Sequence, residues 1–215
     1  MRVLAVPVKS LEEAKRRLSR VLSPAERAVV TLAMLEDVLD ACQAQEGWEV
    51  WVVSRDEAAL EVAVRRGVRP VEEKGRSLLE AIRQAELHMR GRWSSLAVVL
   101  ADLPFLTPAA LGRALSLATK TGVLAAPAAS DGGTNLLVRR PPTAIPARFG
   151  RSSFARHRGE AYRLGVTFQE VRIPELSFDL DWPPDLAQVV AGPRNNRTRA
   201  VCLELGLADR LGVVA

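Results

Sequence analysis

The stretch SLAVVLADLPFLTPAAL, residues 95–111, decides the fold. Its first part, SLAVVLAD, is an apolar run that ends in one acid, which is the pattern of a strand buried on both faces. Thr107-Pro108 then combines a capping hydroxyl with proline at the first helical position, and predicts a helix that continues to about Ala118. A buried strand that leads into a helix is the repeating unit of a parallel sheet covered by helices.

The same alternation extends in both directions from this stretch. Strands are predicted at residues 2–8, 48–54, 68–71, 122–127 and 134–139, with an extended segment at 166–173, and helices at 24–42, 58–65, 77–89, 153–164 and 184–190. No internal repeat, low-complexity tract or long linker divides the chain. The pattern therefore predicts one α/β domain over residues 1–215, a three-layer sandwich with a mainly parallel sheet.

Composition is that of a globular protein. The chain has 215 residues, of which 48% are hydrophobic and 26% charged, enough for one sizeable core. No apolar run approaches the ~20 residues of a membrane span, and the short apolar N-terminus leads into Lys9, unlike a signal peptide. Cys42 and Cys202 lack the spacing of metal ligands. We therefore expect reduced thiols and a cytoplasmic protein without a membrane partner.

The net charge of +5 and the pI of about 9.8 favour an anionic partner, either nucleic acid or a phosphorylated small molecule. Many of the basic residues follow helices, where most side chains of this kind are solvated. With one Tyr, five Phe and four Trp, and no interleaving of aromatic with basic residues, stacking on RNA has little support. A basic nucleic-acid-binding module stays as the non-enzyme alternative, and it predicts an affinity that falls steeply with salt.

Three acids lie where ligands bind in open α/β sheets, beyond the carboxyl ends of the strands. Asp102 ends the run SLAVVLAD, and Asp179 and Asp181 alternate with Phe178 and Leu180. In extended backbone both carboxylates would face a cleft while the two apolar side chains face the core. Three converging carboxylates suit Mg²⁺ or Mn²⁺. The alternative is that these acids are ordinary turn or helix-capping residues.

Two loops are candidates for binding an anion. Asp131-Gly132-Gly133-Thr134-Asn135 offers close backbone approach and a hydroxyl, although Asp-Gly is also typical of a tight turn. Phe149-Gly150-Arg151-Ser152-Ser153 leads into a helix, whose N-terminus suits phosphate, and the alternative is an ordinary serine cap. On the sequence alone both interpretations stay open for each loop.

The residues that follow the first predicted strand are basic. Lys9, Lys15 and Arg17 could clamp a triphosphate, and the alternative is a solvated helix face. Neither a P-loop nor a dinucleotide fingerprint is present, and with two histidines and no GxSxG sequence there are few candidates for acid–base or covalent catalysis. Transfer of a nucleotide to a phosphate needs neither, because the attacking oxygen is already anionic and positioning with charge neutralisation suffices.

Five segments in the same order resemble the 2-phospho-L-lactate guanylyltransferase family of deazaflavin coenzyme (F-420) biosynthesis, including its phosphoenolpyruvate-using members. They are VPVKSLEEAKRRLSRVLSPAER (6–27), LADLPFLTPAAL (100–111), DGGTNLL (131–137), FGRSSFARH (149–157) and FDLDWPPDL (178–186). The resemblance implies a nucleotidyltransferase fold of the glycosyltransferase-A type. It also implies transfer of GMP from GTP to the phosphate of 2-phospho-L-lactate or phosphoenolpyruvate, release of pyrophosphate, and a downstream deazaflavin-coupling enzyme as partner.

The resemblance also implies roles for residues. It makes Asp102, Asp179 and Asp181 the catalytic metal ligands, Thr134, Gly150 and Ser153 the acceptor-phosphate contacts, and Lys9 and Lys15 the contacts to the GTP phosphates. Two motifs differ from the family: Ser77-Leu78-Leu79 stands where a Gly-Leu-Asn element is usual, and Gly150-Arg151-Ser152-Ser153 where Gly-Pro-Gly-Ser is usual.

Other enzymes of the same broad fold are the alternatives. Molybdenum-cofactor and sugar-phosphate nucleotidyltransferases carry a glycine-rich first loop, whereas this chain has PVKSLEEAK. A glycosyltransferase with an Asp-x-Asp motif would not explain the two anion loops. Which acid accepts the nucleotide depends on pocket shape and is left open, as is the oligomeric state.

Overall fold

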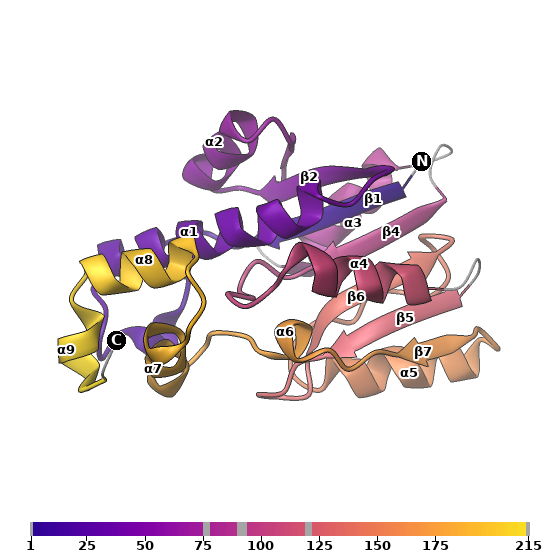
Figure 1. Cartoon of the computed structure of the whole chain (residues 1–215). Helices are drawn as coiled ribbons and strands as arrows, with labels where there is room; N and C mark the ends of the chain where they lie inside the picture. Colours follow the sequence, from indigo (N-terminus) through magenta and orange to yellow (C-terminus); the bar gives the residue numbers. More distant parts are fainter. Residues whose placement is uncertain (1, 75–77, 90–93, 119–121, 214–215) are drawn as a thin grey trace.

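A central sheet of seven strands runs through the part of the chain that the computed structural model describes, residues 2–74, 78–89, 94–118 and 122–213 (Figure 1). The strand order is β3-β2-β1-β4-β6-β5-β7. The strands are β1 (Arg2–Val8), β2 (Trp48–Ser54), β3 (Arg69–Glu72), β4 (Ser95–Val99), β5 (Gly122–Pro127), β6 (Thr134–Arg140) and β7 (Phe168–Glu170). Each predicted strand is present, and the predicted extended segment contains β7.

The sheet is mainly parallel, as predicted. β1 pairs in parallel with β2 and β4, β2 with β3, and β5 with β7. β6 runs antiparallel to both of its neighbours, β4 and β5. The connection from β5 to β6 is too short for a parallel crossover, so the chain must turn back on itself at Asp131-Gly132.

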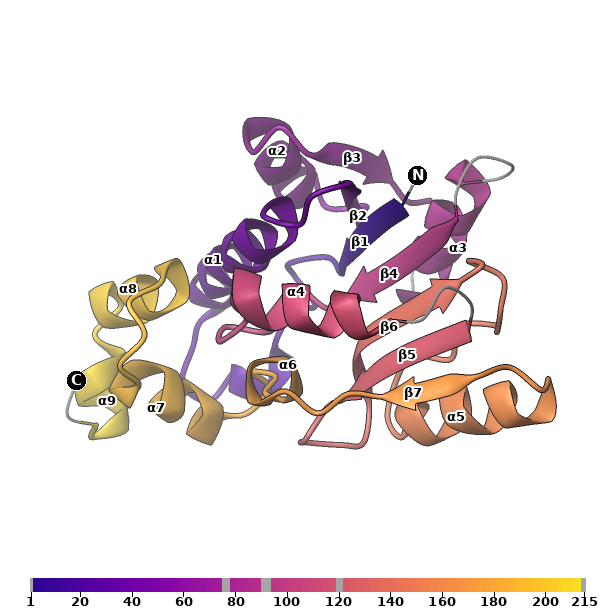
Figure 2. The same cartoon turned by 45° about the vertical axis from the view of Figure 1, so that its right-hand side comes forward.

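Helices cover both faces of the sheet (Figures 1 and 2). They are α1 (Pro24–Gln43), α2 (Glu57–Arg65), α4 (Pro108–Leu117) and α6 (Pro174–Ser177) on one face, and α3 (Leu78–His88) and α5 (Ser153–Arg163) on the other. Each layer of helices encloses a hydrophobic core against the sheet: the first core lies under α1, α2, α4 and α6, and the second under α3 and α5. Since side chains alternate along a strand, Leu4 and Val6 of β1 point into the first core, and Val3 and Ala5 point into the second. The predicted three layers are therefore confirmed.

A third core lies beside the sheet, where the C-terminal helices meet the segment that follows β1. The C-terminal helices α7 (Pro183–Ala191), α8 (Arg197–Glu204) and α9 (Leu207–Leu211) pack on the N-terminal half of α1 and on the short 3-10 helix η1 (Arg16–Leu18). Leu18 and Met34 meet Cys202 and Leu207 in this core. Of these C-terminal helices only α7 was predicted, because the apolar residues of α8 follow helical spacing only weakly.

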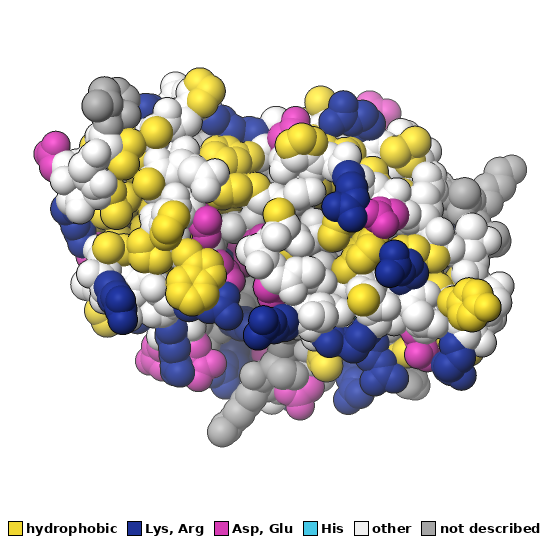
Figure 3. Space-filling model, turned by 90° about the horizontal axis from the view of Figure 1, so that it is seen from below, with side chains coloured by type: hydrophobic (Ala, Val, Ile, Leu, Met, Phe, Trp, Pro, Cys, Tyr) yellow, Lys and Arg dark blue, Asp and Glu magenta, His cyan; other side chains and the backbone are white. Residues whose placement is uncertain are grey.

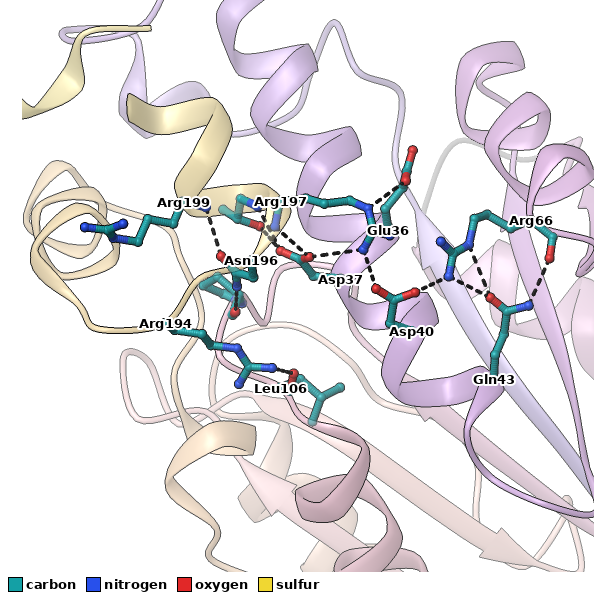
Figure 4. A network of polar contacts seen from close by, with 12 residues as sticks. Glu36, Asp37, Asp40, Gln43, Arg66, Leu106, Arg194, Asn196, Arg197 and Arg199 are labelled. Atoms are coloured by element: carbon teal, nitrogen blue, oxygen red, sulfur yellow. Dashed lines mark hydrogen bonds and ion pairs between the residues drawn. The ribbon is translucent and has the colours of Figure 1, made fainter. Parts of the chain in front are cut away.

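Polar contacts fix α8 to α1 (Figure 4). The buried carboxylate of Asp37 accepts hydrogen bonds from the backbone N–H of Thr198 at 2.9 Å and from its hydroxyl at 2.6 Å. Arg197 pairs with Glu36 at 3.2 Å and with Asp40. The side chain of Asp37 therefore satisfies donors at the N-terminus of α8, which the helix itself leaves without partners.

Two further observations concern the cysteines and the helices. Cys42 and Cys202 are both buried free thiols, and burial raises the pKa of each to about 12. None of the helices found in the described ranges combines the length and apolarity that crossing a membrane would demand.

Candidate active site

A cavity of ≈ 390 Å³ opens beyond the carboxyl end of β4. Seven of the eight predicted site residues line it: Lys9, Lys15, Asp102, Thr134, Gly150, Asp179 and Asp181. They come from segments 8–18, 100–102, 128–135, 149–151 and 178–181, which are far apart in the sequence. On the face shown in Figure 3, acidic and basic side chains gather along a hollow between two apolar areas.

The acidic segments are aligned by backbone contacts. β4 ends at Val99, three residues before Asp102, so Asp102 lies in the loop after the strand and not at its last position. The backbone N–H of Leu180 donates to the carbonyl of Asp102 at 3.0 Å, which places the Asp179–Asp181 segment beside it. Leu180 is buried in the third core and Phe178 packs against Phe105 with ring centroids 4.6 Å apart. The predicted alternation, carboxylates to the cavity and apolar side chains to the core, is confirmed.

Arg194 and Asn196, which lie between α7 and α8, hold the loop that carries Asp102 (Figure 4). Arg194 donates to the carbonyls of Phe105 and Leu106, the latter at 2.6 Å. The side-chain amide of Asn196 donates to the carbonyl of Pro104 at 2.5 Å. The segment just before α8 therefore fastens the loop that carries Asp102.

Lys15 is the centre of the charged network. Its ammonium lies 2.7 Å from Oδ2 of Asp102 and 3.0 Å from Oδ1 of Asp181, and its side chain is 8% exposed. Burial opposes the charge on Lys15, but the two carboxylates together raise its pKa above the ordinary value. Arg17 reaches the other oxygen of Asp181 at 2.6 Å and lies over the ring of Trp182. Lys15 is therefore a cation held between two acids, in addition to its predicted role toward GTP.

The backbone at Lys15 is also unusual. Its φ of 49° lies in the left-handed region, and the other non-glycine residue of this kind in the described ranges is Ser152, with φ 56°. Lys15 lines the cavity, and Ser152 directly follows Arg151, which lines it as well. Left-handed backbone is costly for residues with a Cβ, so the surrounding contacts must hold these two loops in place.

Asp179 and Asp181 differ in their electrostatic surroundings. Burial raises the pKa of Asp179 to about 6, the charges of Asp102 and Asp181 add to the rise, and a 2.8 Å hydrogen bond from the hydroxyl of Ser130 opposes it. Burial also opposes ionisation of Asp181, but Lys15 and Arg17 outweigh it and lower the pKa of that carboxyl. Asp179 is therefore the acid of the site whose charge is poorly compensated by protein groups.

The free oxygens of the site fit a divalent cation that is shared with a substrate. Oδ1 of Asp102 and Oδ1 of Asp179 are buried and have no hydrogen-bond partner. Within the described ranges no group of three or more acidic, histidine or cysteine side chains is arranged to hold a metal by itself. Mg²⁺ in nucleotide-dependent enzymes is commonly held by one or two carboxylates with phosphates and water completing its shell. Asp102 and Asp179 meet that requirement, whereas both oxygens of Asp181 are engaged by cations.

The two anion loops form one structure. The N–H of Ser152 donates to the carbonyl of Asp131 at 3.2 Å, and the N–H of Phe154 donates to that of Gly132 at 3.2 Å. The carboxylate of Asp131 accepts from the N–H of Gly133 at 2.7 Å, so the segment is a tight turn as well as part of the cavity wall. A Cβ at Gly133 would lie 2.6 Å from that carboxylate, which explains the glycine. Gly150, with φ +112°, likewise needs the freedom of glycine.

Ser153 is the predicted site residue that does not line the cavity. It is fully buried behind Thr134, with its hydroxyl 3.0 Å from the Thr134 hydroxyl. His157, also fully buried, lies on the other side of that hydroxyl, with Nδ1 3.0 Å from it. Sequence reasoning gave His157 no role, although Ser153 and His157 are four residues apart and so share a face of α5. It also missed Ser130, which lies 49 residues from its partner Asp179 and carries no local signal.

A second cavity of ≈ 190 Å³ adjoins the first. It is lined by the Pro7–Lys9 and Glu13–Lys15 segments, and it shares Lys9, Lys15, Asp102 and Asp181 with the larger cavity. Lys9 is exposed and has no ion-pair partner among the residues with described positions. The two cavities therefore meet at one wall of acidic and basic side chains.

The two motifs that depart from the family pattern lie on different parts of the molecule. Arg151 is exposed and lines the larger cavity, so its charge is available to an anion there. Ser77 lies outside the described residues, and Leu79 is partly buried against the second core. Leu79 thus has a packing role in this chain.

Comparison with known proteins gives consistent results. Residues 1–209 match the family described as "Guanylyl transferase CofC like". A phosphoenolpyruvate guanylyltransferase from Sphaerobacter thermophilus is 38% identical over 190 residues, 87% of this chain and 91% of that protein. A 3-phospho-D-glycerate guanylyltransferase from Phenylobacterium zucineum is 34% identical (89% and 91% covered), and a 2-phospho-L-lactate guanylyltransferase from Methanothermobacter thermautotrophicus 36% (86% and 82%).

Among solved structures, one described as a nucleotide-diphospho-sugar transferase from Desulfovibrio desulfuricans superposes with a TM-score of 0.79. It covers 100% of both chains at 16% sequence identity, so it speaks to the fold alone. The predicted nucleotidyltransferase type of α/β fold is confirmed.

Proposed function

The chain belongs to the Guanylyl transferase CofC like family, and on that premise we propose that it transfers GMP from GTP to the phosphate of phosphoenolpyruvate or 2-phospho-L-lactate. An oxygen of the acceptor phosphate attacks the α-phosphorus of GTP, and the bond from that phosphorus to the bridging oxygen breaks. Pyrophosphate leaves with the bonding electrons. The product contains a new phosphoanhydride that joins GMP to the phosphate of the acceptor acid.

The observation that carries this proposal is the pair of cavities that meet at the Lys9, Lys15, Asp102 and Asp181 wall. A transfer between two anionic substrates needs two adjoining sites with charges of both signs between them. The larger cavity has the loops around Thr134 and Gly150, which suit the phosphate of an acceptor. The smaller one lies under the basic segment after β1, which suits the phosphates of GTP.

The residues of the wall have separate tasks in this mechanism. The attacking phosphate oxygen is already an anion, so no general base is required. Lys9 and Lys15 would neutralise charge on the GTP phosphates, and Lys15 would exchange part of its contact with Asp102 and Asp181 for them. Asp102 and Asp179 would hold Mg²⁺ or Mn²⁺ through their free oxygens. When bound there, the ion would supply positive charge that offsets the negative charge of the phosphates.

We further propose a place for the reaction in coenzyme F-420 biosynthesis, followed by a deazaflavin-coupling enzyme that consumes the product. A phosphoanhydride between GMP and the phosphate of the acid is an activated compound, so an enzyme that transfers the acid-bearing phosphoryl group to another molecule must act next. The cytoplasm is the proposed location, which the two buried free thiols support because reduced cysteines are usual there.

The test is turnover with each acceptor supplied separately. Purified protein with Mg²⁺ and GTP receives phosphoenolpyruvate, 2-phospho-L-lactate or 3-phospho-D-glycerate. Release of pyrophosphate is followed, and the downstream coupling enzyme converts the unstable product to a form that mass spectrometry identifies. Asp102→Asn is expected to abolish turnover, whereas Glu72→Gln, which changes an exposed acid on the edge strand β3, is the matched control. No turnover with any of these acids across GTP, ATP, CTP and UTP would refute the proposal.

A further inference from the structure

Three buried side chains form a hydrogen-bonded row behind the larger cavity. Thr134 is 2% exposed, and Ser153 and His157 are fully buried. The Thr134 hydroxyl oxygen lies 3.0 Å from Nδ1 of His157 and 3.0 Å from the hydroxyl of Ser153. Of the three, only Thr134 lines the cavity. The side chains of this row can therefore act on a ligand in the cavity only through the Thr134 hydroxyl.

The backbone decides where the proton of His157 lies. The N–H of Arg148 donates to Nε2 of His157 at 2.8 Å, and since an N–H can only donate, Nε2 must be without a proton. Burial, together with the charges of Arg139, Arg156 and Arg148, lowers the pKa of His157 to about 3, so the ring is neutral near pH 7. A neutral imidazole carries one N–H, which must then be on Nδ1. His157 therefore donates to Thr134.

The direction of the remaining bonds follows from counting protons. Thr134 and Ser153 have one hydroxyl proton each, and one hydrogen bond joins them. Neither proton can point at His157, because Nδ1 is a donor. One of the two protons is therefore left without an acceptor in the described protein. Ser153 is fully buried and does not line the cavity, so its proton finds an acceptor only in Thr134. Both lone pairs of the Thr134 oxygen are then filled, and the Thr134 proton is free to enter the cavity.

We propose that His157 is a positioning residue that, by donating to Thr134, makes the Thr134 hydroxyl a donor directed at an anionic oxygen of the acceptor. A hydroxyl that can only donate binds phosphate or carboxylate oxygen well and does not accept a hydrogen bond from a hydroxyl or ammonium group. The inference rests on the proposed function for the identity of the anion. It does not rest on it for the direction of the hydrogen bonds.

The ring of His157 is held in place independently of any ligand. Phe149 packs edge-on against it with centroids 5.3 Å apart, and Phe149 itself lines the cavity. Arg156 donates to the carbonyl of Arg148 at 3.1 Å, which fixes the peptide next to the one that binds Nε2. The orientation that the proposal requires is therefore present before an acceptor binds.

The first test reads the proton directly. The chain has two histidines, so a long-range ¹H–¹⁵N spectrum of ring-labelled protein shows two rings, and His88→Gln identifies the one that belongs to His157. We expect Nδ1 to be protonated and Nε2 to be unprotonated from pH 5 to pH 8. A ring protonated on Nε2, or one that titrates in this range, would overturn the inference and leave the proposed function untouched.

The second test separates positioning from a purely structural role. His157→Asn keeps an N–H near the position of Nδ1, and His157→Gln keeps only an acceptor near the position of Nε2. The KM for the acceptor is expected to rise roughly tenfold in His157→Gln and much less in His157→Asn, with the KM for GTP unchanged in both. Equal acceptor KM values in the two variants, whatever their stability, would refute the proposal.

The third test asks whether His157 acts through Thr134. Thr134→Val removes the hydroxyl and is expected to raise the acceptor KM, while Thr134→Ser restores it. In the Thr134→Val background, His157→Gln should have no further effect on the acceptor KM, and an additive effect would overturn the inference. If no acid is turned over at all, the proposed function fails, and Thr134→Val must still weaken binding of inorganic phosphate for the inference to stand.

Discussion

Replacing Asp179 by asparagine removes a buried negative charge, and we expect the variant to be inactive yet more stable than the parent protein at neutral pH. The carboxyl of Asp179 has a pKa of about 6 in the folded protein, against an ordinary value of 3.8. Burial is the main cause, and the nearby carboxylates of Asp102 and Asp181 add to it. The asparagine amide has the same shape and carries no charge.

The magnitude follows from the shift. Between the ordinary and the folded pKa, the folded state keeps a proton that the unfolded state releases. The contribution of Asp179 to stability is therefore fully present below about pH 4 and is lost as the pH rises through 6. A shift of about two units corresponds to about 3 kcal/mol at pH 8, and roughly half of that loss has occurred at pH 5. Since Asp179 is 8% exposed, solvent screening reduces this only slightly.

The assay is urea unfolding of both proteins at pH 5 and pH 8 with EDTA present, so that no divalent cation compensates the charge. The free energy of unfolding of Asp179→Asn should exceed that of the parent at pH 8, and the difference should shrink by about half at pH 5. Asp181→Asn is the matched control, two residues away. Lys15 and Arg17 lower the pKa of Asp181, so its charge stabilises the fold above the ordinary pKa, and that variant should be less stable at pH 8.

Equal stabilities of Asp179→Asn and the parent at pH 8 would refute this reasoning, as would a difference that does not change with pH. The same result for both asparagine variants would also refute it, because it would show that position and not charge determines stability.

Three further predictions concern the contacts around the site. Ser130→Ala removes the hydroxyl that donates to Asp179 at 2.8 Å, so the pKa of Asp179 should rise further and the acid limb of the kcat/KM profile should move to higher pH. Lys15→Met leaves two carboxylates without their shared cation, and its free energy of unfolding in EDTA should fall by about 3–5 kcal/mol and recover in part with excess Mg²⁺; no such recovery would contradict the metal site. Asn196→Ala loses both the cap of α8 and the bond to Pro104, and urea unfolding should show a loss of about 1–2 kcal/mol together with a lower kcat, whereas an unchanged kcat would show that the loop needs no such support.

Most of the sheet and the helices around it could be predicted because their signals are local. Ser23 and Glu26, three residues apart, form a capping box at the start of α1, and Thr107 caps α4 as expected. The apolar run of β4 is buried throughout. These features depend on neighbours a few residues apart, which a single sequence displays.

The remaining features depend on contacts between distant segments. Lys15 meets Asp102 across 87 residues and Asp181 across 166, so the sequence could suggest three acids and a basic loop but not their ion pairs. The donor role of His157 depends on the backbone N–H of Arg148, a group that every non-proline residue possesses and that leaves no trace in composition. Likewise α8 is formed largely by its tertiary contacts with α1.

The third core has a consequence for the order in which the protein can become active during synthesis. Leu18 and Leu22 are synthesised well before their partners in α7, α8 and α9. A nascent chain that stops before Arg194 contains every residue of the charged wall but lacks the side chains that fasten the Asp102 loop. The site is thus complete only once the segment before α8 has been synthesised, and a chain cut before Arg194 is expected to be inert although its active-site sequence is intact.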